Sequence, residues 1–284
     1  MRFTLRRIFT LFMKNFPPEI TDLTIDLLNG DWQSLYNCAL VCRAWFPRSR
    51  YNLLRNIRLT KHSEALMLMH RFREACIPED QSPRELSIVE DHAPDSRPFV
   101  HTVPSIFLRT TSSMMLESLS IDGIRWREGV VPPGHPFWSS LSQLTSLTSL
   151  TLDNCRFVNF RQFQRLVYVL PQLSHLKISR GTTWSRRKTP ILHTHLPRLR
   201  QLEIDGCNRR VTSALLRWVC DTPTCQSLRQ LVYEPPPRSR DALGDMAVAL
   251  ALAARIFSPQ WDCERTSTAL SHLDIPDSHL QMTE

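Results

Sequence analysis

Residues 147–155 read LTSLTLDNC, and the pattern of this stretch recurs along the chain. In each copy an apolar residue, usually leucine, is followed three places later by a leucine, and two places after that by another apolar residue. Such alternation is typical of a β-strand that buries one face, because successive side chains point to opposite faces. Further close copies occupy residues 116–121, 173–178, 199–207, 228–233 and 270–275. A phrase repeated in this way predicts a chain built from stacked strands.

Two weaker copies, around Ile57 and Leu86, extend the repeat toward the N-terminus. Several gaps between copies hold a stretch with the apolar spacing of a helix, opened by a residue that suits a helix N-cap. The predicted stretches run from Ser63 to Cys76, Asn159 to Leu170, Thr212 to Cys220 and Asp241 to Phe257. Strands that alternate with helices favour an α/β fold with a parallel sheet, because a parallel pair needs a long crossover connection.

The repeated phrase resembles that of leucine-rich repeats, L-x-x-L-x-L-x-x-N/C, and Cys155 and Cys207 stand at its Asn/Cys position. The spacing departs from the family because it is longer and less regular than the usual period of roughly 20 to 29 residues. The resemblance implies an irregular, horseshoe-shaped solenoid over residues 57–284, with a concave parallel β-sheet. Solenoids of this kind present extended binding surfaces.

The sequence before the repeats has a helical spacing of apolar residues. A first helix is predicted to begin at the proline pair 17–18, because the N–H groups that proline lacks need no partner in a first turn. The Asn-Gly pair at 29–30 ends it, Asp31 caps a second helix, and the Phe-Pro pair at 46–47 breaks that helix before a third one over 48–55. Three helices this short enclose a very small core, so we expect the segment to lean on a neighbour.

Residues 16–58 also resemble an F-box. The family pattern L-P-x-E-[LI] is matched by FPPEI at 16–20, with Phe16 in place of leucine, and V-C-[RK]-x-W is matched by VCRAW at 41–45. The resemblance implies that these three short helices bind the Skp adaptor of a cullin-RING ubiquitin ligase. The residues assigned to this contact are Pro17, Glu19, Ile20, Leu23, Ile25, Leu28, Val41, Cys42 and Trp45. The alternative is that the helices only cap the N-terminal end of the solenoid.

Arginine outnumbers lysine 31 to 4, and arginines recur six to ten places after the strand centres. The pattern predicts a basic rim whose substrate-binding residues are Arg125, Arg127, Arg156, Trp184, Arg186, Arg187, Lys188, Arg209 and Arg210. Guanidinium groups bind phosphate and carboxylate in a bidentate manner, so the rim favours an acidic or phosphorylated protein substrate. The alternative is that these arginines only keep the rim soluble.

Acidic residues recur three places beyond the strand centres, at Asp122, Asp153, Asp205 and Glu234. We expect these side chains to close the turns after the strands by hydrogen bonds to the backbone. The chain as a whole has a formal net charge of +8, with 9 Lys+Arg against 4 Asp+Glu in residues 1–60 and 26 against 23 in the rest. The excess is diffuse, which makes an Arg-rich nucleic-acid binder a weak alternative. The basic segment 1–15 is predicted to be a helical extension.

We expect no catalytic residue, no metal site and no cofactor. The eight cysteines form no C-x-x-C pair, and the chain has only seven glycines and no phosphate-binding loop. The nearest acid-base cluster, His272, Asp274, Asp277 and His279, flanks the last strand copy. No apolar run reaches the roughly 18 residues of a membrane-spanning helix.

The predicted function is therefore that of a non-catalytic, substrate-recognition subunit of an SCF-type ubiquitin ligase, located in the cytoplasm or the nucleus. Its helices would bind the Skp adaptor and its repeats a protein substrate. The alternatives are a leucine-rich-repeat scaffold without a ubiquitin link and the nucleic-acid binder.

Overall fold

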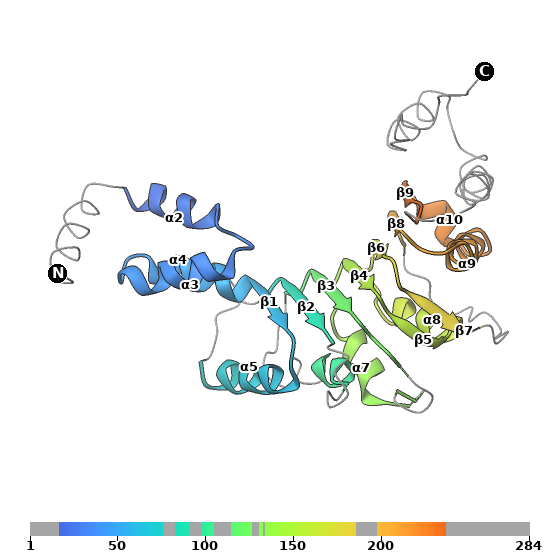
Figure 1. The fold of residues 1–284 in the computed structure, drawn as a ribbon, viewed down its shortest axis with the longest axis horizontal. Coiled ribbons are helices and arrows are strands. Elements are labelled where there is room, and N and C mark those ends of the chain that lie inside the picture. The colour runs from blue at the N-terminus through green and yellow to red at the C-terminus, as the bar shows by residue number, and fades with distance from the viewer. Residues whose placement is uncertain are drawn as a thin grey trace, which may run out of the picture.

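The computed structural model describes residues 17–75, 83–90, 98–104, 115–126, 131–132, 134–185 and 198–236. The expected extension 1–15, the helical run from Asp241 and the strand copy at 270–275 lie outside these ranges. The described chain has an α/β fold, in which a parallel seven-stranded sheet carries helices on one face (Figure 1). A group of short helices projects beyond the first strand of that sheet.

The N-terminal helices are α2 (Pro18–Asp26), α3 (Trp32–Val41) and α4 (Phe46–Arg55). As predicted, the Asp31 side chain caps α3 by accepting a hydrogen bond from the Ser34 N–H. Between α2 and α3 the chain turns at Gly30, whose φ of +98° lies in the left-handed region that glycine adopts without steric cost. The start of α3 and the turn before it therefore lie where Asp31 and Gly30 predicted them.

The boundary between α3 and α4 differs from the prediction. The helix α3 already ends at Val41, and the Phe-Pro pair at 46–47 starts α4 instead of breaking α3. A proline suits the first turn of a helix as well as the position after one, because in the first turn no N–H is required of it. The prediction of a third helix beginning at Arg48 was wrong by two residues.

The strands of the main sheet are β1 (Asn56–Leu59), β2 (Glu85–Val89), β3 (Ser118–Asp122), β4 (Ser149–Asp153), β6 (His175–Ile178), β8 (Gln201–Asp205) and β9 (Gln230–Glu234). They lie side by side in chain order, and every neighbouring pair is parallel. The predicted strand centres are paired with one another across the sheet, in the order Ile57, Leu86, Leu119, Leu150, Leu176, Leu202 and Leu231. The phase of the repeated phrase thus predicted the register of this sheet.

The connections contain α5 (His62–Ala75), the 3-10 helix η2 (Val100–Thr102), α7 (Pro136–Ser142), α8 (Phe160–Tyr168), α9 (Arg209–Cys220) and α10 (Thr224–Ser227). Asn159 caps α8 as predicted, since its side chain accepts a hydrogen bond from the Gln162 N–H. The predicted start of α9 at Thr212 was wrong. Its N-cap is Asn208, which accepts from the Val211 N–H.

The core lies between the sheet and the helices that cover it. The apolar strand residues, such as Leu119, Leu150 and Leu176, are almost fully buried and belong to one continuous cluster with side chains of α7, α8 and α9. A second, two-stranded parallel sheet of β5 (Arg156–Asn159) and β7 (Thr183–Ser185) adds to this layer. The sequence pattern did not predict it.

Candidate protein-binding surfaces

The helices α2 and α3 expose apolar side chains in stripes. On α2 and the turn after it these are Ile20, Leu23 and Leu27, and on α3 they are Trp32, Tyr36 and Leu40. The spacings of three and four residues in the first set, and of four and four in the second, place each set on one side of its helix. Leu27 is 86% exposed and Trp32 is 66% exposed. We call these six residues, with Val41 and Phe46, the apolar helix surface.

The helical segment 17–55 has few buried apolar side chains. Among residues 17–55 the buried apolar side chains are Ile25 and Leu35, accompanied by the polar Ser49 and Asn52. An apolar surface that exceeds the apolar interior is typical of a segment completed by a partner.

A polar network ties α2 to α4. Arg48 donates to both carboxylate oxygens of Asp26, with Nε 2.6 Å from Oδ1, and the Asn52 amide donates to Oδ1 at 2.8 Å. These hydrogen bonds, chiefly that from Arg48, lower the pKa of Asp26. The network fixes the two helices against each other without using the exposed stripes.

The structure distributes the nine predicted adaptor residues between the surface and the interior of the helical segment. Pro17, Glu19, Ile20, Leu23 and Val41 are exposed, whereas Leu28, Cys42 and Trp45 are partly buried. Ile25 is only 1% exposed.

The predicted set left out Leu27, Trp32, Tyr36 and Leu40, which are among the most exposed apolar side chains of the segment. The i, i+4, i+8 spacing of Trp32, Tyr36 and Leu40 was visible in the sequence and could have indicated this stripe.

The sheet has a face that no described helix or strand covers, which we call the open face (Figure 1). Its side chains form rows across the paired strands. The first row is Asn56, Glu85, Ser118, Ser149, His175, Gln201 and Gln230, and the middle row is Arg58, Ser87, Ser120, Thr151, Lys177, Glu203 and Val232. The end row, where the strands finish, contains the acidic residues Asp122, Asp153, Asp205 and Glu234.

One acidic residue of the open face, Glu203, is paired with basic side chains of a neighbouring strand. The Glu203 carboxylate lies 3.1 Å from Lys177 Nζ and 3.1 Å from His175 Nε2. Burial alone would raise the pKa of Glu203, but hydrogen bonding and positive charge from Lys177 and His175 outweigh burial and lower it. In the end row the balance is reversed at Asp153, because burial and the negative charge of Asp122 raise its pKa.

The predicted rim residues do not form one described cluster. Arg125 and Arg156 are exposed and paired by a β-bridge, while Arg209 and Arg210 are exposed in the first turn of α9. Trp184 is half-buried and stacks on Phe163, with ring centroids 5.5 Å apart. Arg127, Arg186, Arg187 and Lys188 lie outside the described residues.

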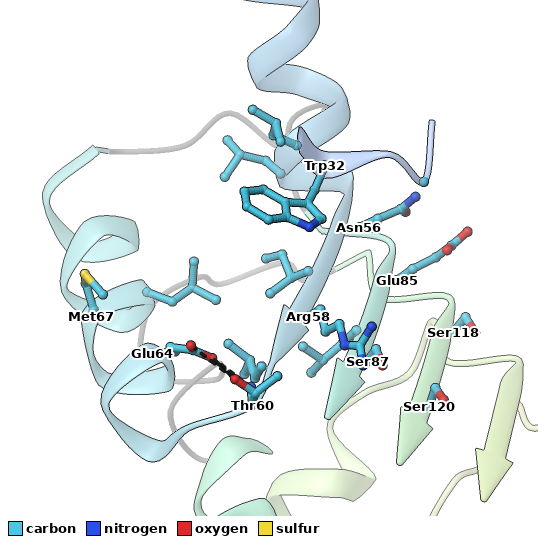
Figure 2. Close-up of a pocket in the computed structure, with 17 residues that line it drawn as sticks. Trp32, Asn56, Arg58, Thr60, Glu64, Met67, Glu85, Ser87, Ser118 and Ser120 are labelled. Atoms are coloured by element: carbon cyan, nitrogen blue, oxygen red, sulfur yellow. Dashed lines mark hydrogen bonds between the residues drawn. The ribbon is translucent and has the colours of Figure 1, made fainter. Parts of the chain in front are cut away.

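A hollow of about 710 Å³ lies around β1, an end strand of the sheet. Figure 2 shows Trp32 above this strand, Met67 and Glu64 of α5 to one side, and Arg58 and Ser87 toward the open face. The Glu64 carboxylate is engaged, because it accepts hydrogen bonds from the N–H groups of Thr60 and Lys61. The hollow therefore joins the apolar helix surface to the first strands of the open face.

No protein-family model matches this chain, and none of the curated proteins compared with it is detectably similar.

The described residues offer little for metal or thiol chemistry. Among them, no three His, Cys, Asp or Glu side chains could together hold a metal ion, and the cluster from His272 to His279 lies outside them. Burial raises the pKa of the Cys155 and Cys207 thiols to about 12, which disfavours the reactive thiolate. Within the same ranges no helix combines the length and apolar character needed to cross a membrane.

Proposed function

We propose that the chain is the substrate-recognition subunit of an SCF-type cullin-RING ubiquitin ligase, with an F-box in its N-terminal helices and a leucine-rich-repeat solenoid in the rest. In this proposal the helices bind the Skp adaptor, and the repeat region binds a protein substrate. Ubiquitin transfer is performed by other subunits, so this chain is a receptor and not a catalyst.

The observation that carries the proposal is the apolar helix surface. Large apolar side chains exposed in stripes on short helices, around an interior of two aliphatic residues, favour a partner that covers them. The stripe residues Ile20 and Leu23 fall within the segment that matches the F-box pattern. This coincidence of motif and exposed surface supports adaptor binding over a role limited to capping the sheet.

The arrangement of the sheet supports the second half of the proposal. Neighbouring strands carry the same phrase in the same register, and the described helices leave one face of the sheet open. Stacked repeats of this kind build a long surface from residues far apart in sequence, which suits recognition of a protein.

Replacing Ile20 with Asp tests the adaptor contact. Ile20 is 47% exposed in the free chain, so the substitution should leave the fold intact. In the complex it would bury a carboxylate in an apolar contact, at a cost of at least about 2 kcal/mol, or roughly thirtyfold in affinity. We expect purified Skp adaptor to be captured by the wild-type chain and to be lost from Ile20→Asp.

The matched control is Leu66→Asp on α5, where a leucine of similar exposure, 42%, lies outside the apolar helix surface. This variant should capture the adaptor as the wild type does. Retained capture by Ile20→Asp, or an equal loss in both variants, would contradict the F-box assignment and leave a repeat scaffold without a ubiquitin link.

A further inference from the structure

The open face is unusual for a parallel sheet. Such sheets are generally covered on both faces, because their crossover connections place helices on each side. Here the described helices cover one face, and the middle row of the other bears short polar side chains on three neighbouring strands, Ser87, Ser120 and Thr151. Short side chains leave room for another polypeptide to approach the strands.

The charge of this face is concentrated at one end of the strands. Asp122 is paired in register with Asp153, and Asp205 with Glu234. Among the described residues no Lys, Arg or His forms an ion pair with these four side chains, in contrast to Glu203 in the neighbouring row. The pKa of Asp153 is raised by burial and by the charge of Asp122, although Arg180 partly opposes this. No ion pair within the described residues therefore balances the end row, and the positive charges of Arg180 and Lys177 oppose it from beyond ion-pair distance.

We propose that the open face is a docking surface for an extended, lysine- or arginine-rich segment of a partner protein, whose cationic side chains pair with the end row. The inference rests on the proposed function, since it names the substrate class of the repeat region. Charge complementarity decides the occupant: an acidic or phosphorylated segment on this face would meet carboxylates, and a neutral one would leave them unpaired.

The geometry sets the length of such a segment. From β3 to β9 the end row crosses five strands, and neighbouring strands lie about 4.8 Å apart, so the row spans about 19 Å. An extended chain rises about 3.3 Å per residue, so about six residues cover this distance. Alternate residues of that segment point to the same side, which gives two or three cationic side chains facing the carboxylates.

The test uses three fluorescent hexapeptides and the full-length chain. One peptide alternates lysine with serine, the second replaces lysine with glutamate, and the third replaces it with phosphoserine. Fluorescence anisotropy should show binding of the lysine peptide alone, weakening as salt rises because the contact is between exposed charges.

Asp205→Asn and Asp221→Asn form a matched pair of variants. Both remove one carboxylate, but Asp221 lies at the end of α9 on the covered side of the sheet. We expect Asp205→Asn to weaken binding of the lysine peptide by up to about fivefold, since exposed ion pairs contribute little individually. The double variant Asp153→Asn/Asp205→Asn should weaken it by about tenfold, and Asp221→Asn should bind as the wild type does. Far-ultraviolet circular dichroism and melting curves will show that the variants are folded.

Equal binding of the lysine peptide by wild type and the double variant would overturn the proposal. So would stronger binding of the glutamate or phosphoserine peptide, which would place recognition on the arginines. Peptide binding does not involve the adaptor. A negative peptide result would therefore leave the conclusion from the Ile20→Asp experiment unchanged, and loss of the adaptor contact would leave the peptide result unchanged.

Discussion

At the scale of single residues, Cys155 and Cys207 act as hydrogen-bond donors beneath the ends of the strands. The Cys155 thiol donates to the carbonyl oxygens of Asp153 at 3.1 Å and Ile121 at 3.4 Å, and the Cys207 thiol donates to those of Ile178 and Ser179. Each cysteine is at most 1% exposed, so its hydrogen bonds to these carbonyl groups take the place of bonds to water. This role requires the protonated form of both side chains.

The thiols should make stability fall at high pH. Their pKa is about 12 in the folded chain against an ordinary value of 9.0, so the stability that they contribute is complete below pH 9 and is lost as pH rises toward 12. A Cys155→Ala/Cys207→Ala variant should be less stable at pH 7 by roughly 1–3 kcal/mol per site. In urea unfolding it should also lose less stability between pH 9 and 12. Groups other than the two thiols titrate equally in the wild type and the variant, so they cancel when the two proteins are compared. If the free energy of unfolding fell by the same amount between pH 9 and 12 in both proteins, this prediction would be contradicted.

At the scale of elements, α9 shows how a helix start depends on one side chain. Asn208 and Thr212 both precede apolar helical positions, but only the Asn208 side chain caps the helix. Thr212 is 2% exposed within α9, and its hydroxyl has no hydrogen-bond partner among the described residues.

Asn208→Ala should therefore destabilise the chain by about 1 kcal/mol, the usual cost of losing an N-cap. Thr212→Val should cause no loss, because it replaces an unpaired buried hydroxyl with a methyl group of similar size. Urea unfolding of both variants measures the difference. A larger loss for Thr212→Val would mean that the helix starts where the sequence first indicated.

The sequence predicted the strands better than the helices for a physical reason. The alternating pattern around Leu119, Leu150 and Leu176 allows only one strand register, because a shift of one residue would turn every leucine to the solvent-exposed face. On α3 both sides are apolar, with Leu35 on one and Trp32 on another, so the pattern alone could not say which side faces the interior. That ambiguity is also why part of the candidate adaptor surface was missed.

At the scale of the whole molecule, the two candidate surfaces are separate. The apolar helix surface lies on α2, α3 and the start of α4, beyond the β1 end of the sheet, whereas the acidic end row runs from β3 to β9 (Figure 1). The end row is acidic although the chain has a formal net charge of +8, so a basic segment would be attracted by this face and not by the net charge. If the chain has the proposed function, an adaptor and a substrate would therefore bind at separate places and would not compete.

The sheet should also unfold as one body, because its core is continuous from Ile57 to Tyr233. Cutting the chain after Ser179 would expose Leu176 and Ile178 on one fragment, and Leu202 and Ile204 on the other, all of which are at most 1% exposed in the intact chain. Each such side chain contributes roughly 1.5–3 kcal/mol when buried, and four of them approach the whole stability of a typical domain, about 5–15 kcal/mol. Residues 1–179 and 180–284 expressed separately should therefore aggregate, whereas the intact chain should melt in a single calorimetric transition. Two soluble fragments, each with its own transition, would show instead that the repeats fold as independent halves.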